Sequence, residues 1–120
     1  MGWIVEIGDE FEPEFDCLHE DVRTEILALS RLLQLVGPHL GRPRVDTLHG
    51  SRHANLKELR FSAARGEWRV AFAFDPKRKA ILLVAGVKSG VSEKRFYREL
   101  IRKAEERYDA HLVRLKTGRE

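Results

Sequence analysis

The 120-residue sequence contains very little cysteine, and this scarcity excludes several classes of protein. The single Cys17 cannot form an internal disulfide, and it excludes any zinc site built from several cysteines. No apolar run approaches the ~18 residues that a membrane span needs, and the N-terminus lacks the basic and then apolar layout of a signal peptide. With no repeats or flexible linkers, we expect one cytoplasmic domain over residues 1–120, with no membrane partner and a disordered tail at 116–120.

The net charge of +3 hides an uneven distribution of charges along the chain. Residues 1–37 carry nine acidic and two basic side chains, whereas residues 38–120 carry twenty basic and ten acidic ones. Such segregation favours a surface that attracts a polyanion. Two solvated helix faces of opposite sign would give the same counts, so the charges alone leave both interpretations open.

Two helices are predicted from apolar residues that recur at spacings of three and four. The first begins near Pro13 with acidic residues in its first turn, forms one continuous stripe of about seven turns, and stops at Gly37. This stripe places Cys17 beside the core as a small buried side chain. Ser92 can cap the second helix, which extends to Leu115.

Four strands are expected, at Trp3–Ile7, Leu56–Phe61, Glu67–Asp75 and Ala80–Val87, with hairpin-like turns between the last three. The final strand is apolar on both faces and should be buried. Segment 38–54 is polar, basic and without periodicity, and a connection of this length is often functional. The order β-α-loop-β-β-β-α predicts an α+β fold, with helices packed on an antiparallel-rich, four-stranded sheet.

Alternation along the strands predicts which side chains share a face. Within 67–75, four large apolar side chains face one side, whereas Arg69 and two alanines face the other, which suggests a shallow concave face with room for a ligand. If Leu59 joins the aromatic core, Glu58 and Arg60 lie beside Arg69 on this face. An arginine–glutamate ladder on a solvated sheet explains the pattern equally well.

Three further features of the chain carry weaker signals. The loop before the last helix contains Lys88, and its backbone N–H groups could hold a phosphate, although a simple turn at Gly90 fits as well and the spacing of a Walker loop is absent. Tyr97 lies one turn beyond this loop. His49 and His53 are four residues apart in a loop with no acid beside them, so we expect no metal site.

Several runs of residues between Trp3 and Leu115 form a specific combination. They are Asp46-Thr47-Leu48 with Gly50-Ser51-Arg52, Asn55-Leu56-Lys57-Glu58-Leu59-Arg60-Phe61, Trp68-Arg69-Val70-Ala71-Phe72-Ala73-Phe74-Asp75, Leu82-Leu83-Val84-Ala85-Gly86-Val87-Lys88-Ser89-Gly90, and Phe96-Tyr97 with Leu100-Ile101. In combination these runs resemble the RelE/ParE superfamily of bacterial type II toxins, and most of all its HigB-like, phage-derived branch.

The resemblance implies a microbial RNase-like fold and a toxin that cuts mRNA in the ribosomal A site without a metal or other cofactor. The 2′-hydroxyl of the messenger attacks the adjacent phosphate, which requires a base, an acid and cations for the phosphorane charge. Carried over by position, the catalytic set is Lys57, Glu58, Arg60, Arg69, Lys88 and Tyr97. Lys57 and Glu58 both remain candidates for proton transfer. We expect the loop residues Arg42, Arg44 and Arg52 to bind RNA.

The resemblance also implies a partner, a small antitoxin with a helix-turn-helix DNA-binding domain. It could cover the basic surface or dock on the acidic first helix. Close relatives carry an acid where this chain has Val87, so a proton acceptor or a partner for Lys88 is missing. The alternatives are a ParE-like inhibitor of DNA gyrase and a catalytically inactive RNA-binding module, but a set of cations suited to phosphate favours the RNase branch.

Overall fold

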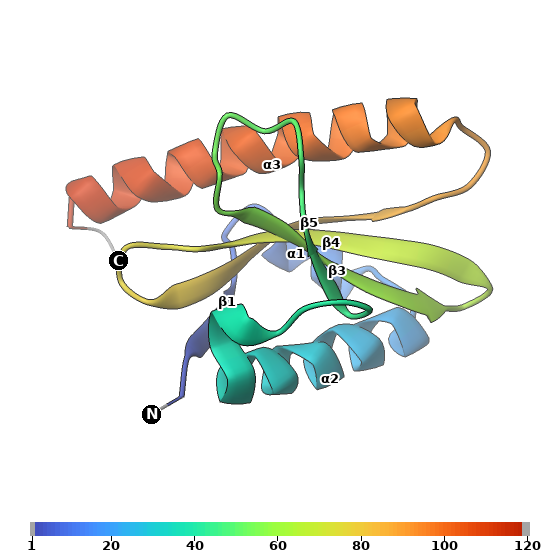
Figure 1. Cartoon of the computed structure of the whole chain (residues 1–120), viewed down its shortest axis with the longest axis horizontal. Coiled ribbons are helices and arrows are strands. Elements are labelled where there is room, and N and C mark those ends of the chain that lie inside the picture. The colour runs from blue at the N-terminus through green and yellow to red at the C-terminus, as the bar shows by residue number, and fades with distance from the viewer. Residues whose placement is uncertain (1, 119–120) are drawn as a thin grey trace.

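The computed structural model describes residues 2–118, in which a five-stranded sheet lies between two helical layers (Figure 1). The elements are β1 (Ile4–Ile7), α1 (Glu12–Asp16), α2 (Glu20–Val36), a 3-10 turn (Gly37–His39), β2 (Val45–Thr47), β3 (Leu56–Ala63), β4 (Gly66–Phe74), β5 (Lys79–Val87) and α3 (Glu93–Lys116). The strand order is β1-β5-β4-β3-β2, with β1 parallel to β5 and every other neighbouring pair antiparallel.

The α+β class is confirmed, but the sheet has five strands where the sequence predicts four. The additional strand, β2, lies inside segment 38–54 and pairs with β3, with Val45 opposite Leu59 and Thr47 opposite Lys57. A strand of three residues is too short to show an alternating pattern, so the pairing with β3 and not the local sequence defines it.

The prediction of one continuous first helix is wrong, because the chain breaks between α1 and α2. His19 has an extended backbone with ψ of 142°, and its ring Nδ1 accepts a hydrogen bond from the N–H of Asp21 at 2.9 Å. This cap starts a new helix without disturbing the apolar stripe, which is why the spacing did not reveal it. Cys17 ends α1 and is exposed, so the expectation that it is buried is also wrong.

Each face of the sheet is covered by its own hydrophobic core. One core joins α1 and α2 to the sheet and includes Phe11, Ile26, Leu33, Leu59, Val70 and Phe72. The other joins α3 to the opposite face and includes Leu56, Ala71, Ala73, Leu83, Leu100 and Tyr108. β5 contributes Leu82 to the first and Leu83 to the second, which confirms that this strand is buried on both faces.

The face of Ala71 and Ala73 is not the open ligand surface expected from the sequence. Both alanines are fully buried in the core beneath α3. Their small side chains admit the helix and not a ligand, since a helix packs close only where the facing side chains leave room. Only the end of this face at Arg69 and Glu58 remains polar.

The last helix begins as predicted and ends later than expected. The Ser92 hydroxyl accepts a hydrogen bond from the N–H of Arg95 at 3.2 Å and caps α3. The helix includes Lys116, where the tail was expected to begin, and residues 119–120 lie outside the described part. No helix within residues 2–118 is long and apolar enough to cross a membrane.

The C-terminal half of α3 is anchored to the β4–β5 turn by a buried pair. The His111 ring lies 2.8 Å from Oδ2 of Asp75, and both side chains are almost fully buried. The other oxygen of Asp75 accepts the backbone N–H groups of Lys77 and Lys79. The pair therefore joins the turn to the helix that covers the sheet.

Replacing His111 with alanine should lower the free energy of unfolding by about 3 kcal/mol, because Asp75 is then left buried without its side-chain partner. Chemical denaturation at neutral pH, followed by circular dichroism, measures the change. Glu106→Ala is the matched control, since this exposed carboxylate pairs with Arg102 on the surface and should matter much less. An equal loss in the two variants would contradict the anchoring role.

Candidate functional site

Two arginines face each other across neighbouring strands at the open end of the α3 side of the sheet. Arg60 of β3 and Arg69 of β4 are direct register partners, so their side chains leave the same face. Like charges directly opposite one another are unfavourable in a sheet. The arrangement therefore requires an anion, either within the protein or from a ligand.

Glu58 supplies the internal anion. Its Oε2 accepts a hydrogen bond from Nη1 of Arg60 at 2.8 Å, and its Oε1 lies 3.8 Å from Nε of Arg69. The carboxylate is only 4% exposed, and Oε1 has no hydrogen-bond partner. Burial is the largest single influence on Arg60 and lowers its pKa, but the hydrogen bond and the charge of Glu58, together with Tyr97, outweigh burial, so the pKa of Arg60 is raised. The clustering of these three residues, expected from strand alternation, is observed.

Tyr97 extends the cluster from the sheet to the first turns of α3. Its hydroxyl accepts a hydrogen bond from Nε of Arg69 at 3.2 Å. Burial raises the pKa of the Tyr97 phenol, Arg69 opposes this, and Glu58 raises it further, so the net shift is upward. Arg69 itself is 6% exposed and also donates to the backbone oxygen of Trp68. Arg69 therefore holds the Tyr97 hydroxyl in place from a buried position in the sheet.

Lys88 lies over the ring of Tyr97. Its Nζ is 5.6 Å from the centroid of that ring and 3.4 Å from a carboxylate oxygen of Glu93 in the first turn of α3. The loop that carries Lys88 includes Gly90 in the left-handed region, at φ of 73°. The cluster thus places one cation beside the hydroxyl of Tyr97 and another over its ring.

A cleft of about 450 Å³ opens beside this cluster. Its lining comes from segment 42–49, from β3 and from the start of α3, and it comprises Arg42, Asp46, Thr47, Leu48, His49, Glu58, Arg60, Glu93 and Tyr97. His49, which the sequence analysis considered only as a metal ligand, is therefore a residue of the cleft wall. No local pattern indicates a cleft role for this position, because β2 brings segment 42–49 to β3 only in the folded chain.

The three basic loop residues separate into two groups. Arg42 lines the cleft and pairs with Asp46 at 2.7 Å, and the backbone oxygen of Arg44 accepts the N–H of Arg60. Arg52 instead forms an ion pair with Asp109, twelve residues beyond Tyr97 in α3, which corresponds to about 18 Å along a helix. Arg52 fastens its loop to α3 and does not border the cleft.

Lys57 and Val87 lie on the opposite face of the sheet. Lys57 alternates with Glu58 and pairs with Phe72, a residue of the core beneath α2. The side chain of Val87 lies against the position where Gly66 would carry a Cβ, on the side of Trp68. An acid at position 87 would therefore leave the sheet away from Tyr97, so its absence removes nothing from the cleft itself.

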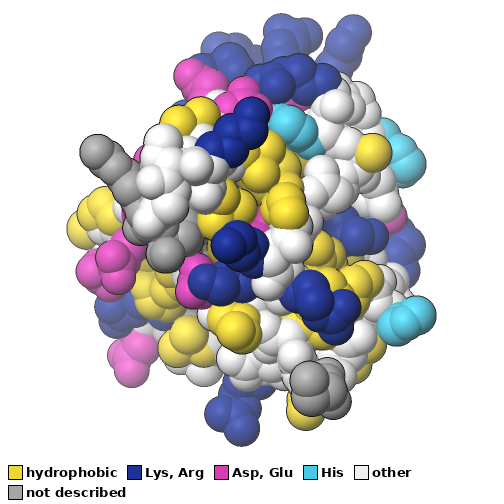
Figure 2. Space-filling model, turned by 90° about the vertical axis from the view of Figure 1, so that its left-hand side faces the viewer, with side chains coloured by type: hydrophobic (Ala, Val, Ile, Leu, Met, Phe, Trp, Pro, Cys, Tyr) yellow, Lys and Arg dark blue, Asp and Glu magenta, His cyan; other side chains and the backbone are white. Residues whose placement is uncertain are grey.

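Part of the charge segregation in the sequence disappears in the folded chain. Glu14 of α1 binds Arg107 of α3 at 2.7 Å, and Arg114 of α3 lies 3.1 Å from Glu10. Figure 2 shows the end of the molecule at the β4–β5 turn, where basic side chains are interspersed with acidic and hydrophobic ones. Positive charge is thus not confined to the cleft. What distinguishes the cleft is that arginine, carboxylate, imidazole and phenol side chains line it together.

The sequence itself matches a known family over most of its length. Residues 13–109 match the family described as phage derived protein Gp49-like. The chain belongs to this family. Two curated relatives of this Gp49-like chain come from Mycobacterium tuberculosis. The putative toxin HigB2 is 40% identical over 94% of this chain and 56% of its own length, and the putative toxin HigB3 is 42% identical over 87% of this chain and 89% of its own length.

Solved structures share the fold of this Gp49-like chain. A mutant of the E. coli toxin RelE in the free state superimposes with a TM-score of 0.64 at 12% identity, over 89% of this chain and 98% of RelE. RelE from the RelE–RelB complex of Pyrococcus horikoshii gives 0.53 at 18% identity, over 76% of this chain and 100% of that one. The predicted membership in the HigB-like branch, with a RelE-like fold, is confirmed. Within residues 2–118, no three side chains of His, Cys, Asp or Glu are grouped to hold a metal.

The chain has two tyrosines, Tyr97 and Tyr108, so both phenols can be followed in one titration. Burial raises the pKa of each, and we expect both to ionise above the ordinary value of about 10. Glu58→Gln removes a negative charge that disfavours the Tyr97 phenolate, so the pKa of Tyr97 should fall while that of Tyr108 stays unchanged. NMR of 13Cζ-labelled tyrosine measures this, and equal shifts at both residues would contradict the geometry.

Proposed function

We propose that this protein is the toxin of a type II toxin–antitoxin system and that it cuts mRNA on the ribosome. The observation that carries the proposal is the pair of facing arginines, bridged by Glu58 and adjoining Tyr97, at the edge of an open cleft. Kinship with putative toxins supports it. The chain spans about half the length of HigB2, so the activity is proposed for the residues present here.

The cations of the cluster suit a phosphate that gains charge during the reaction. Arg60 lines the cleft and is the guanidinium best placed to meet a phosphate, where its planar fork allows two parallel hydrogen bonds. Arg69 is buried, and its hydrogen bond to the Tyr97 hydroxyl holds the phenol in position. Lys88 adds a positive charge over the ring of Tyr97. Fixed charges of this kind stabilise a phosphorane without reorganising during the reaction.

The proposed reaction proceeds by attack of the 2′-oxygen on the adjacent phosphorus. The bond from phosphorus to the 5′-oxygen breaks, which leaves a 2′,3′-cyclic phosphate and a free 5′-hydroxyl. The 2′-hydroxyl proton passes to Glu58, whose Oε1 lacks a hydrogen-bond donor. The raised pKa of Tyr97 keeps its phenol protonated at neutral pH, so it can give a proton to the leaving oxygen. Lys57, on the opposite face, takes no part.

A partner antitoxin follows from this function. RelE of Pyrococcus horikoshii was solved in complex with RelB, which supports an antitoxin as the partner of this chain as well. The antitoxin proposed here carries a helix-turn-helix DNA-binding domain, and the toxin acts in the cytoplasm, where translating ribosomes supply its substrate.

Arg60→Ala should reduce mRNA cleavage by about 100-fold or more, because it removes a charge aimed at the reacting phosphate. The measurement is a map of mRNA 5′ ends after the protein is induced in growing cells. Wild-type protein should give ends in phase with codons, and these should vanish when translation is blocked. Arg31→Ala, at an exposed arginine of α2, is the matched control and should cleave normally.

The proposal fails if the wild-type protein produces no codon-phased ends. Cleavage of plasmid DNA by gyrase in the presence of the protein would instead identify a gyrase inhibitor. Growth arrest that is unchanged in Arg60→Ala would indicate a non-catalytic mode of action.

Arg44→Ala should weaken binding to single-stranded RNA equally for all sequences and reduce the slope of log affinity against log salt by about 0.7. The exposed Arg44 adjoins Arg60 through the backbone, whereas Arg52 is held by Asp109. Fluorescence anisotropy with a labelled RNA at several salt concentrations measures the slope. Arg52→Ala should keep the wild-type slope, and a similar decrease in both variants would contradict the assignment of the RNA surface.

A further inference from the structure

The C-terminal part of β5 has an unpaired edge. β1 pairs with β5 only from Lys79 to Leu82, after which the N–H of Gly8 donates to the oxygen of Leu82. The next carbonyl, that of Leu83, accepts a hydrogen bond from Nη1 of Arg107 at 2.8 Å. Within residues 2–118 no strand pairs with β5 beyond this point on the side away from β4.

The backbone groups at this edge point outward. The N–H of Lys88 donates to the oxygen of Glu67 at 2.8 Å, so this pair hydrogen-bonds across the β4–β5 ladder. Because bonded and non-bonded pairs alternate in antiparallel strands, the N–H and C=O groups of Ala85 and Val87 point away from β4. An edge of this kind is a template for another strand unless it is protected.

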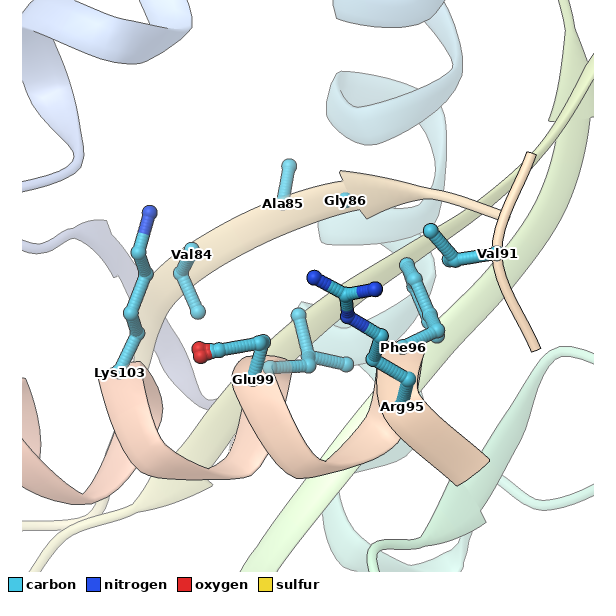
Figure 3. Close-up of a pocket in the computed structure, with 9 residues that line it drawn as sticks. Val84, Ala85, Gly86, Val91, Arg95, Phe96, Glu99 and Lys103 are labelled. Atoms are coloured by element: carbon cyan, nitrogen blue, oxygen red, sulfur yellow. The ribbon is translucent and has the colours of Figure 1, made fainter. Parts of the chain in front are cut away.

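An apolar groove lies directly beside this edge, between β5 and α3 (Figure 3). Its apolar lining comprises Val84, Ala85, Gly86, Val91, Phe96 and Leu100. A side chain at Gly86 would meet the Phe96 ring at 3.0 Å, so the glycine lets this ring pack directly against β5 in the groove wall. The groove holds about 210 Å³, less than the ~300 Å³ of the smallest typical small-molecule sites, and it suits one or two side chains of a peptide.

Two cations border the groove without ion pairs among the described residues. Arg95 and Lys103 lie on α3 and point toward β5, with Glu99 between them (Figure 3). Glu99 is held by Arg102 at 3.3 Å, which lies outside the groove. The positive charge of Lys103 helps to lower the pKa of Glu14, but the Glu14 carboxylate is itself bound by Arg107. Since neither Arg95 nor Lys103 forms an ion pair within residues 2–118, the rim offers two positive charges to a ligand.

The spacing of these cations matches an extended peptide. Arg95 and Lys103 are eight residues apart, which is about 12 Å along a helix. Residues i and i+4 of a strand are about 13 Å apart and point to the same side. A strand added to β5 could place acids at i and i+4 opposite the two cations, with an apolar residue at i+2 in the groove.

We propose that the β5 edge and this groove bind an extended segment of a partner protein with the pattern acidic-x-apolar-x-acidic, which adds to the sheet as a sixth strand. Main-chain hydrogen bonds to Ala85 and Val87 provide affinity, and the groove and the two cations provide specificity. The natural source of this segment is the antitoxin, and to that extent the proposal rests on the proposed function. The bound strand would lie beside Val87 and restrain the Lys88 loop, which links occupancy of the groove to the cleft.

The test uses the purified full chain and a fluorescein-labelled peptide of seven residues, with glutamate at its second and sixth positions, valine at its fourth and threonine elsewhere. Anisotropy should detect binding to the wild-type protein. The double variant Arg95→Glu with Lys103→Glu should bind at least tenfold more weakly. A peptide with lysines in place of the glutamates should bind the double variant better than the wild type. The matched control, Arg31→Glu with Lys77→Glu, reverses two exposed charges elsewhere and should bind normally.

Backbone methylation of the peptide tests strand addition separately. Methyl groups on the amides of one alternating set should abolish binding, because those N–H groups face β5, whereas methylation of the other set should be tolerated. Equal tolerance of both sets would overturn the proposal. So would peptide binding that is insensitive to the charge reversals, a dimer of this chain that buries the edge, or a single-stranded RNA that displaces the peptide from the groove.

The binding measurement does not depend on mRNA cleavage. Peptide binding by a protein that cuts no mRNA would refute the proposed function and leave the docking site intact. Cleavage by a protein that binds no peptide would do the reverse. The double variant should cleave mRNA at the wild-type rate, since Arg95 and Lys103 lie outside the cleft.

Discussion

The ionic contact between Glu58 and the two arginines opposite it governs the architecture of the candidate site. Arg60 and Arg69 are register partners on one face of the sheet, and without a carboxylate between them their charges would repel. Glu58 holds both within 3.8 Å and fixes the directions in which their guanidiniums point. The hydroxyl of Tyr97 then accepts a hydrogen bond from Arg69, and this bond joins the sheet to α3 at the place where the cleft opens. Neutralising Glu58 would therefore disturb the arginines, the phenol and the cleft wall together.

Helix α3 organises two different surfaces. Its first turns carry Glu93 and Tyr97, which line the cleft, and the neighbouring side of the same turns carries Arg95 and Glu99, which border the groove at the β5 edge. The alanines of β4 let this helix lie close to the sheet, and the buried pair of Asp75 and His111 anchors its far end. A rigid helix fixed at both ends can thus position one surface for a nucleic acid and another for a polypeptide.

Sequence reasoning predicted the polar cluster because it depends on a local rule. Side chains alternate along a strand, so Glu58 and Arg60 had to share a face, and the apolar partners of Arg69 showed which face that was. The same reasoning did not find β2, and without β2 it could not bring His49 to the cleft. It also grouped Arg52 with the cleft, although Asp109 draws that arginine to the far part of α3. These errors all concern contacts between segments distant in sequence.

Local sequence patterns were enough to predict the order of most elements, the buried character of β5 and the face on which the cations lie, because periodicity and capping residues act over a few residues, and the combination of motif runs indicated the family. Tertiary packing was needed to show that Ala71 and Ala73 are covered by α3, that His19 divides the first helix, and that Val87 lies beside Trp68 and away from Tyr97. It also decided where β5 lacks a neighbour. Such features depend on which segments pack together, and the free energy of that packing belongs to the whole chain and not to any local pattern.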